Sequence, residues 1–265
     1  MIDRVAEAVA ARDWDALRAL ASDEFRYDDR TKRALVSGDV EVWIASASFL
    51  ASESAGKDYE LLGTLGDRIC VDRVVWKGAP DGTYFELDRI RVVELDDAGG
   101  LRAFLLFDVE DRAAAFEEAE ARFLAGEAAG VAGQAPVSAW VSAVCRHDWE
   151  ALLELLASDF VFDDRRTLGL GVLDRERWLE SLRALGELTQ NLALEESQTL
   201  AWNHHGRVTA RRAFGTNLEG GPFENVFAAL TLCEGDRIRR LEMFDLDDAE
   251  RAVARFHELC ATRSA

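Results

Sequence analysis

Two stretches of this chain carry nearly the same sequence, and together they decide the fold. Residues 13–30 read DWDALRALASDEFRYDDR, and residues 148–165 read DWEALLELLASDFVFDDR, 135 positions further on. At this offset residues 13–50 align with residues 148–185 without a gap. Shared composition alone would give roughly two or three identical pairs over such a stretch. The observed pairs exceed that number and include Asp13/Asp148, Trp14/Trp149, Phe25/Phe160, Asp29/Asp164 and Trp43/Trp178.

The offset between the copies sets the domain organisation. It is far longer than the roughly 20–50 residues of a solenoid unit, so the repeat is a duplicated domain. The chain has 265 residues, of which 49% are hydrophobic, and this is enough for two modest cores. A segment rich in Gly and Ala separates the copies. We predict a first lobe over residues 1–125, a linker over residues 126–136 and a second lobe over residues 137–265.

The charge of the chain excludes one class of partner. Its 31 basic and 50 acidic residues give a net charge of −19, which argues against a surface that follows nucleic-acid phosphates. The sequence has no apolar run of about 18 residues and no basic-then-apolar start. We therefore expect a cytoplasmic protein with neither a nucleic-acid nor a membrane partner.

Cysteine, histidine and glycine patterns give no sign of a metal or a cofactor. The four cysteines lack CxxC spacing and do not match between the copies, so reduced thiols are expected. The four histidines form no ligand cluster, and His204 and His205 adjoin a predicted turn. Phosphate-binding and dinucleotide-binding glycine motifs are missing from the sequence. We expect no metal site and no cofactor.

Both copies show the same order of predicted elements. Two short amphipathic helices come first, and Asp13 or Asp148 is the predicted N-cap of the second helix. One strand follows, and then a third helix that begins at Asp39 or Asp174. Further strands are predicted over Leu61–Leu65, Ile69–Trp76, Tyr84–Leu95 and Leu101–Phe107, and over Leu192–Trp202, Arg207–Phe214, Phe223–Cys233 and Ile238–Phe244. With closing helices over Glu110–Leu124 and Asp247–Cys260, each copy is predicted to be an α+β domain.

Motifs in the second copy resemble a known family. Residues 206–216 read GRVTARRAFGT, followed by GGPFEN at 220–225, GDRI at 235–238 and MFD at 243–245. This series is similar to the SnoaL-like branch of the NTF2-like superfamily. The resemblance implies two tandem cone domains, each with helices packed on a curved antiparallel sheet, whose mouth is a small-molecule pocket. Members include polyketide cyclases, ketosteroid isomerases, epoxide hydrolases and non-catalytic modules of bacterial regulators, so the fold leaves the function open.

Asp29 and Asp164 are the candidate catalytic residues. Side chains alternate along a strand, so Asp29 shares a face with Phe25 and Tyr27, and Asp164 shares one with Phe160 and Phe162. A carboxyl group on this apolar face is desolvated, which raises its pKa and suits it to proton transfer. Alternatively, each Asp-Asp-Arg motif caps a turn, with the aspartate paired to Arg30 or Arg165.

The likeness to ketosteroid isomerase is incomplete. The resemblance places the oxyanion-binding tyrosine near Val5 or Trp140 and the second donor near Arg91 or Ala228. Val5 has no donor, and Trp140 offers only its indole N–H. Without these donors an enolate loses its largest stabilising interaction, which argues against isomerase chemistry in either lobe.

The two copies differ most along their last two strands. Where the first copy has only apolar residues, the second has Arg240 and Glu242, and Asn225 lies among aromatic residues. If these faces meet the cone, they join Asp164 in a polar ligand-binding group. The alternative is an exposed strand surface. We expect the second lobe to hold the functional site and the first to be its degenerate partner.

The aromatic residues of the repeat are candidate ligand contacts as well as core. Tyr27 and Trp43 in the first copy, and Trp140, Phe162 and Trp178 in the second, belong to apolar faces that meet the predicted cone. Binding of a small, largely apolar molecule is the expected function, with aspartate-mediated proton transfer as its enzymatic extension. The alternative is a non-catalytic sensory or assembly module of a larger bacterial regulator. We also expect the two lobes to pair as an intramolecular pseudo-dimer.

Overall fold

The computed structural model describes residues 1–53, 56–79 and 83–262 and divides into two compact units. The first unit is Met1–Arg122 and the second is Phe123–Ala265. Helix α4 ends at Ala125, and α5 begins at Gln134, inside the segment expected to be a linker. The lobe and linker boundaries, and the pairing of the lobes as a pseudo-dimer, stay predictions.

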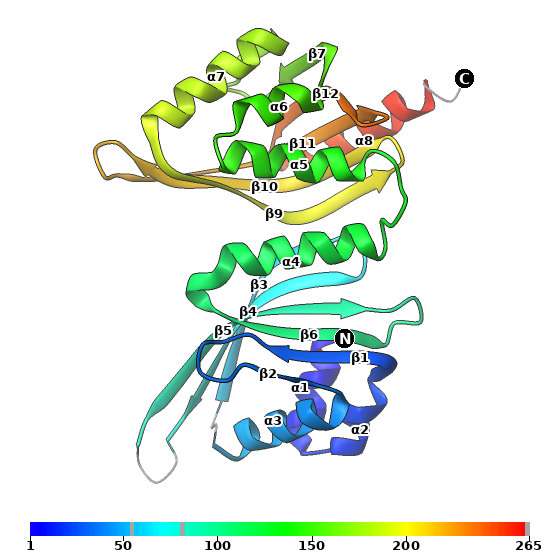
Figure 1. Ribbon diagram of the computed structural model, residues 1–265, viewed down its shortest axis with the longest axis vertical. Helices are drawn as coiled ribbons and strands as arrows, with labels where there is room; N and C mark the ends of the chain where they lie inside the picture. The colour runs from blue at the N-terminus through cyan, green and yellow to red at the C-terminus, as the bar shows by residue number, and fades with distance from the viewer. Residues whose placement is uncertain (54–55, 80–82, 263–265) are drawn as a thin grey trace. The chain divides into compact units, whose positions relative to one another are not determined.

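The first unit combines helices with a six-stranded mixed sheet (Figure 1). Its elements are α1 (Ile2–Ala11), α2 (Trp14–Ala19), β1 (Ala21–Asp29), β2 (Val36–Gly38), α3 (Val40–Glu53), β3 (Gly56–Leu65), β4 (Ile69–Gly78), β5 (Phe85–Leu95), β6 (Leu101–Asp108), the 3₁₀ turn η2 (Val109–Asp111) and α4 (Arg112–Ala125). The predicted order is confirmed. A short edge strand, which was not predicted, ends at Gly38, just before the third helix.

The second unit repeats this order. Its elements are α5 (Gln134–Cys145), α6 (Trp149–Leu155), β7 (Leu156–Asp164), β8 (Gly171–Asp174), α7 (Arg175–Leu188), β9 (Thr189–Asn203), β10 (Gly206–Asn217), β11 (Pro222–Glu234), β12 (Arg237–Asp245), η3 (Leu246–Asp248) and α8 (Ala249–Ala261). Its sheet is also six-stranded and mixed, so the predicted α+β class with two tandem lobes is confirmed.

Local sequence signals explain where the helices begin. Asp13 Oδ1 accepts a hydrogen bond of 2.9 Å from the N–H of Ala16, and Asp148 Oδ1 accepts one of 3.1 Å from Ala151. Each bond satisfies one of the free N–H groups in a first helical turn. Asp174 does the same for α7. The predicted N-caps are confirmed.

Strand register shows which residues correspond between the lobes. The strand order is β2-β1-β6-β5-β4-β3 in the first sheet and β8-β7-β12-β11-β10-β9 in the second. The inner pairs β1/β6 and β7/β12 are parallel, with Asp29 opposite Leu106 and Asp164 opposite Met243. Arg91 lies opposite Leu106 and Ala229 opposite Met243, so Arg91 corresponds to Ala229. The donor position expected near Arg91 and Ala228 thus corresponds to Arg91 and Ala229 in the strand register.

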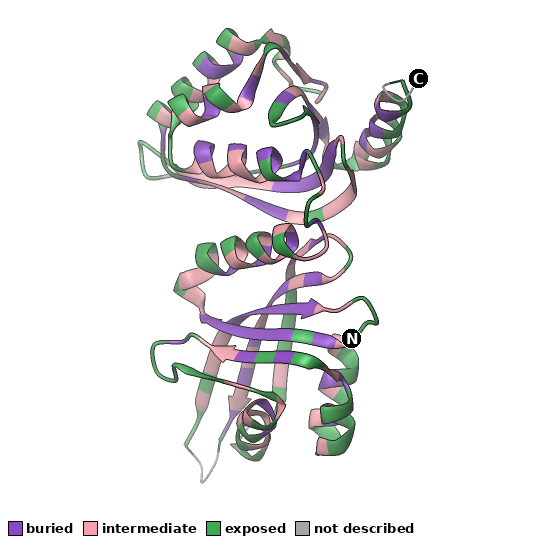
Figure 2. Cartoon of the chain, turned by 45° about the vertical axis from the view of Figure 1, so that its right-hand side comes forward, coloured by how far each residue is buried: buried purple, intermediate pink, exposed green. Residues whose placement is uncertain are grey.

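Each sheet has one helical layer on each face, and its central strands are buried (Figure 2). In the first unit α1–α3 cover one face, and their apolar residues pack on the inward side chains of β1, β4, β5 and β6. The space between α1–α3 and this face is called the first cone, and the matching space under α5–α7 the second cone. Helix α4 covers the other face through the ion pair of Arg122 with Glu94, and α8 covers it in the second unit through Phe256 beside Phe244.

Candidate ligand-binding site

The first cone contains a cavity of about 360 Å³. Its walls are mainly apolar and aromatic, and Val5, Trp43, Trp76 and Phe104 contribute to them from α1, α3, β4 and β6. These side chains meet because α1–α3 cover the same face on which β4 and β6 present their inward residues. The cavity therefore lies where the mouth of an NTF2-like cone is expected.

One lining residue of this cavity, Arg91, belongs to a buried ion pair. Arg91 on β5 lies directly opposite Asp72 on β4, and its Nε donates to Asp72 Oδ1 at 2.8 Å. Arg91 Nη2 donates to the other carboxylate oxygen, so the pair is bidentate. The side chains are only 2% and 5% exposed. The guanidinium also lies 5.1 Å from the ring centre of Tyr59 and 5.2 Å from that of Phe104, which fixes its plane.

A second cation reaches the cavity from β3. Lys57 lines the cavity, and its Nζ lies 5.3 Å from the ring centre of Tyr59. Burial, together with the positive charge of Arg91, lowers the pKa of Lys57 to about 8. Lys57 is therefore an ammonium at neutral pH that loses its charge just above it.

Hydroxyl groups complete the polar part of the lining. Tyr27 on β1 and Ser46 on α3 share a hydrogen bond of 3.0 Å. Burial and the nearby charge of Asp29 raise the pKa of Tyr27 to about 12. Burial also raises the pKa of Tyr59. These phenols stay protonated at neutral pH, so they offer hydrogen bonds and not a base.

The second cone is filled at the matching positions. Trp140 corresponds to Val5 and is 2% exposed, and its ring lies 6.4 Å from that of Trp178. By register Arg211 corresponds to Val74, and its guanidinium lies 5.1 Å from the ring centre of Trp140. Phe160, Phe162 and Trp178 belong to the same buried cluster. The predicted ligand contacts Trp140, Phe162 and Trp178 are thus packed as core, whereas Tyr27 and Trp43 line the first cavity.

Asp164 is buried as expected, but it is not set up for proton transfer. Its carboxylate accepts two hydrogen bonds of 2.8 Å from the guanidinium of Arg166 and one of 3.0 Å from the N–H of Leu170. Burial alone would raise the pKa, but these bonds outweigh it, and the pKa of Asp164 is lowered. The expectation of a raised pKa is wrong. The missing element was the arginine two residues later, which folds back onto the carboxylate.

The other aspartates of the repeated motif hold turns. Asp29 Oδ1 accepts hydrogen bonds from the N–H and the hydroxyl of Thr31, at 3.0 and 2.6 Å. Asp28 pairs with Arg30 at 2.7 Å, and Asp163 pairs with Arg165 at the same distance. These contacts agree with the alternative that the motif caps a turn. The arginine of each motif, Arg30 or Arg165, forms its ion pair with the first aspartate of the motif and not with the second.

The polar group expected in the second cone does not form. Asn225 is exposed, and Arg240 and Glu242 lie on the face that α8 covers, because Leu241 and Met243 point into the cone. Glu242 is completely buried and forms ion pairs with Arg240 at 2.9 Å, with Arg165 at 3.0 Å and with Arg255 of α8 at 3.6 Å. Glu242 therefore does not join Asp164 in a ligand-binding group, and it does not lie on an exposed strand surface. Both expectations are wrong for this residue. It anchors α8.

No binding role was predicted from the sequence for the polar lining residues Lys57, Tyr59 and Arg91, or for Asp72, the ion-pair partner of Arg91. One signal was present: Asp72 shares the strand face of Val74 and Trp76, so it is a charge on an apolar face. Over the described residues, no group of three or more His, Cys, Asp and Glu could hold a metal ion. None of the helices described is long and apolar enough to cross a membrane.

Several solved structures match about one lobe's length of this chain. A hypothetical protein from Catenulispora acidiphila with a ketosteroid isomerase-like fold, in complex with trimethylamine, is 20% identical over 41% of this chain and 82% of its own, with a TM-score of 0.36. An NTF2-like protein from Anabaena variabilis is 22% identical over 41% and 81%, with a TM-score of 0.35. An LEH-like epoxide hydrolase from M. tuberculosis is 15% identical over 48% and 93%, with a TM-score of 0.36.

These matches concern the fold alone. The predicted likeness is to NTF2-like and ketosteroid isomerase-like proteins, and structures described in these words are among the matches. No protein-family model matches the sequence, and no curated protein is similar enough to match it.

Proposed function

We propose that the first lobe binds a small, largely apolar molecule in its cone. The observation that carries this proposal is the cavity of about 360 Å³, walled by Val5, Trp43, Trp76 and Phe104 and provided with a few polar groups. Ligand sites in proteins have volumes of about 300–1,000 Å³ and this same composition. The lobe favoured here is the first, because Trp140 and Arg211 occupy the matching space of the second.

Binding without acid–base catalysis fits the residues best. Asp164 is held ionised by Arg166, and Asp29 is held by Thr31 at the end of β1. The phenol of Tyr27 has a pKa of about 12 and cannot serve as a base at neutral pH. An open first cone also favours binding over the alternative of a pure assembly module, for which two filled cones are expected.

The test uses N-phenyl-1-naphthylamine, a neutral aromatic probe that fluoresces in apolar sites. Val5→Trp introduces into the first cone the residue that the second cone has at this position. We expect the full-length protein to bind the probe and Val5→Trp to lose that binding, because the indole takes up the cavity. Thermal melting checks that the variant is folded.

Glu7→Trp is the matched control, since it adds the same side chain to an exposed position of the same helix. It should bind the probe as the parent protein does. Ala47→Leu, which copies Leu182 of the second lobe, is a second way to fill the cavity. Undiminished binding in both folded cavity variants would contradict the proposal.

A further inference from the structure

We propose that the ligand of the first cone is an amphipathic monoanion, an apolar body with one carboxylate or sulfonate group, and that Lys57 receives the negative charge. This inference rests on the proposed function, which it makes more specific. It follows from the charges that line the cavity and from how each of them is compensated.

Every charged residue of the cavity lining is a cation. Arg12, Lys57 and Arg91 line the cavity, and among its described lining residues there is no aspartate or glutamate. The chain as a whole is strongly acidic, with a net charge of −19, so a purely cationic lining departs from its composition. A pocket of one sign of charge with apolar walls attracts a ligand of the opposite sign.

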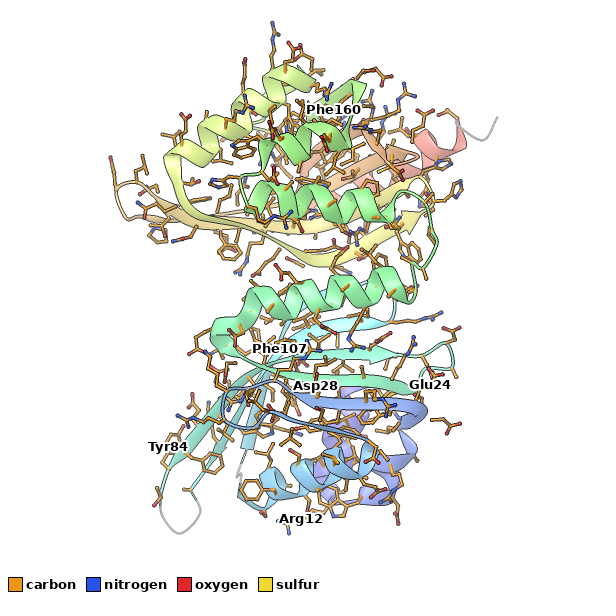
Figure 3. The ribbon with its side chains drawn as sticks, viewed as in Figure 1. Arg12, Glu24, Asp28, Tyr84, Phe107 and Phe160 are labelled. Atoms are coloured by element: carbon orange, nitrogen blue, oxygen red, sulfur yellow. The ribbon has the colours of Figure 1, made fainter. Side chains whose placement is uncertain are left out.

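Two of the three cations have little left to offer. Arg91 is bound on two atoms by the buried carboxylate of Asp72, and the pair is neutral as a unit. Arg12 is exposed at the end of α1, where its Nη2 donates to the carbonyl of Ala51 at 3.4 Å (Figure 3). Water screens a charge at such a position, so its effect on a ligand is small.

Lys57 is the cation without compensation. Within the described part of the chain, no carboxylate lies within ion-pair distance of its Nζ, whereas the neighbouring Lys77 pairs with Asp58 at 2.6 Å. Lys57 is instead partly buried beside the Tyr59 ring and Arg91. A desolvated charge without a counter-charge is unfavourable, and a ligand anion at this point would relieve that cost. One uncompensated cation calls for one negative charge, which favours a monoanion over a phosphate dianion.

The test compares two probes that differ by one anionic group. 8-Anilinonaphthalene-1-sulfonate has the aromatic body of N-phenyl-1-naphthylamine plus a sulfonate. At about pH 7 we expect the sulfonate to bind about tenfold more tightly than the neutral probe, as a charge-assisted hydrogen bond allows. Lys57→Gln should remove most of this difference, so that the two probes bind the variant with similar affinities. Lys77→Gln, in the adjacent strand, should change neither.

The pH dependence gives an independent readout. The sulfonate should bind more weakly as the pH rises through about 8, where Lys57 loses its charge, and Lys57→Gln should abolish this dependence. Tyr59 and Tyr27 line the same cavity, and Cys70 packs against the apolar cluster of the first unit. Burial raises the pKa of each of them, so they stay neutral over this range. Arg12 and Arg91 are guanidinium groups, which keep their charge, and Asp72 remains paired with Arg91. The N-terminal amine is present in both the parent protein and Lys57→Gln, so it cannot account for a difference between them.

The possible failures can be told apart. If both probes bind equally well, or if Lys57→Gln leaves sulfonate binding unchanged, the inference about the anion is wrong. The proposed function then still stands, provided that Val5→Trp abolishes binding of the neutral probe. If neither probe binds to the first cone, both proposals are wrong.

Discussion

The two lobes share one architecture but differ in what fills their cones. Val5 lines the cavity of the first lobe, and Val74 belongs to its buried core, whereas Trp140 and Arg211 at the matching positions pack against each other. The difference extends to the strand end, where Thr31 of the first lobe is replaced by Arg166, which holds Asp164. A few side chains on a common backbone therefore separate a lobe with an open cavity from one whose matching positions are filled by its own side chains.

The residues that the lobes share differ in role from the residues that distinguish them. The residues shared by both copies, such as the helix caps Asp13 and Asp148, serve the architecture. The differences concern the interior of the cone, where a larger side chain removes the binding volume and adds buried apolar contacts. We expect the second lobe to gain stability from the same substitutions that close its pocket.

The largest effect is expected from opening the second cone with Trp140→Val. The indole is almost fully buried and makes ring contacts with Trp178 and Arg211, so its loss leaves a cavity and should destabilise the second lobe by about 3 kcal/mol. Its Nε1 has no hydrogen-bond partner among the described residues, so the loss is one of packing. Peptide-resolved hydrogen exchange should show faster exchange in the second lobe.

The same variant tests whether the two cones are equivalent in shape. With Trp140 reduced to valine, the second cone should acquire the ability to bind N-phenyl-1-naphthylamine. Val5→Trp in the same chain removes binding at the first cone and thereby assigns the new site. Unchanged stability in Trp140→Val would contradict the packed second cone described here.

The next largest effect is a difference in the loss of stability caused by Asp164→Asn and by Asp29→Asn. Asp164→Asn leaves the Arg166 guanidinium without its carboxylate, and since Arg166 is partly exposed, a loss of about 2 kcal/mol is expected. Asp29→Asn should have a smaller effect, because its partner Thr31 is neutral. Hydrogen exchange in each lobe measures both. A larger loss for Asp29→Asn would overturn this ranking of the two motifs.

The pH dependence of stability gives the sign of the Asp164 interaction. Because its pKa is lower in the folded state, the unfolded chain binds more protons, and stability is lost as the pH falls. The contribution is fully present above the unfolded pKa of about 3.9 and disappears as the pH falls through the lower folded value. Asp164→Asn should flatten this part of the stability curve. A curve for the variant that stays parallel to that of the parent would contradict the lowered pKa.

These differences show which features a single sequence can predict. Helix caps, strand faces and the burial of Asp164 follow from local spacing, and the structure agrees with them. The lowered pKa of Asp164 depends on how the loop carrying Arg166 folds back, and no strand periodicity encodes that. The pairing of Arg91 with Asp72 depends on the register of β4 and β5, where a slip of one residue changes every partner.

The location of the open cone is encoded in the sequence by a difference in side-chain volume at one matching position. As possible oxyanion donors Val5 and Trp140 differ little, but the larger indole of Trp140 is what fills the second cone. The polar residues on β12 suggested a site in the second lobe. Their actual role depends on α8, because Arg255 reaches Glu242 from that helix. Sequence patterns show which strand face a residue occupies but not which layer covers it.

The smallest predicted effect concerns the helix N-caps Asp13 and Asp148, which the two lobes have in common. Asp13→Ala and Asp148→Ala each remove one hydrogen bond to a first-turn N–H, from Ala16 and from Ala151. Each should cost about 1 kcal/mol, and the two costs should be equal within error, because an exposed cap depends on the helix alone. Hydrogen exchange in α2 and α6 measures them within one protein. A marked inequality would show that the differing cones also alter their helical layers, and the contrast between the lobes would then extend to the architecture itself.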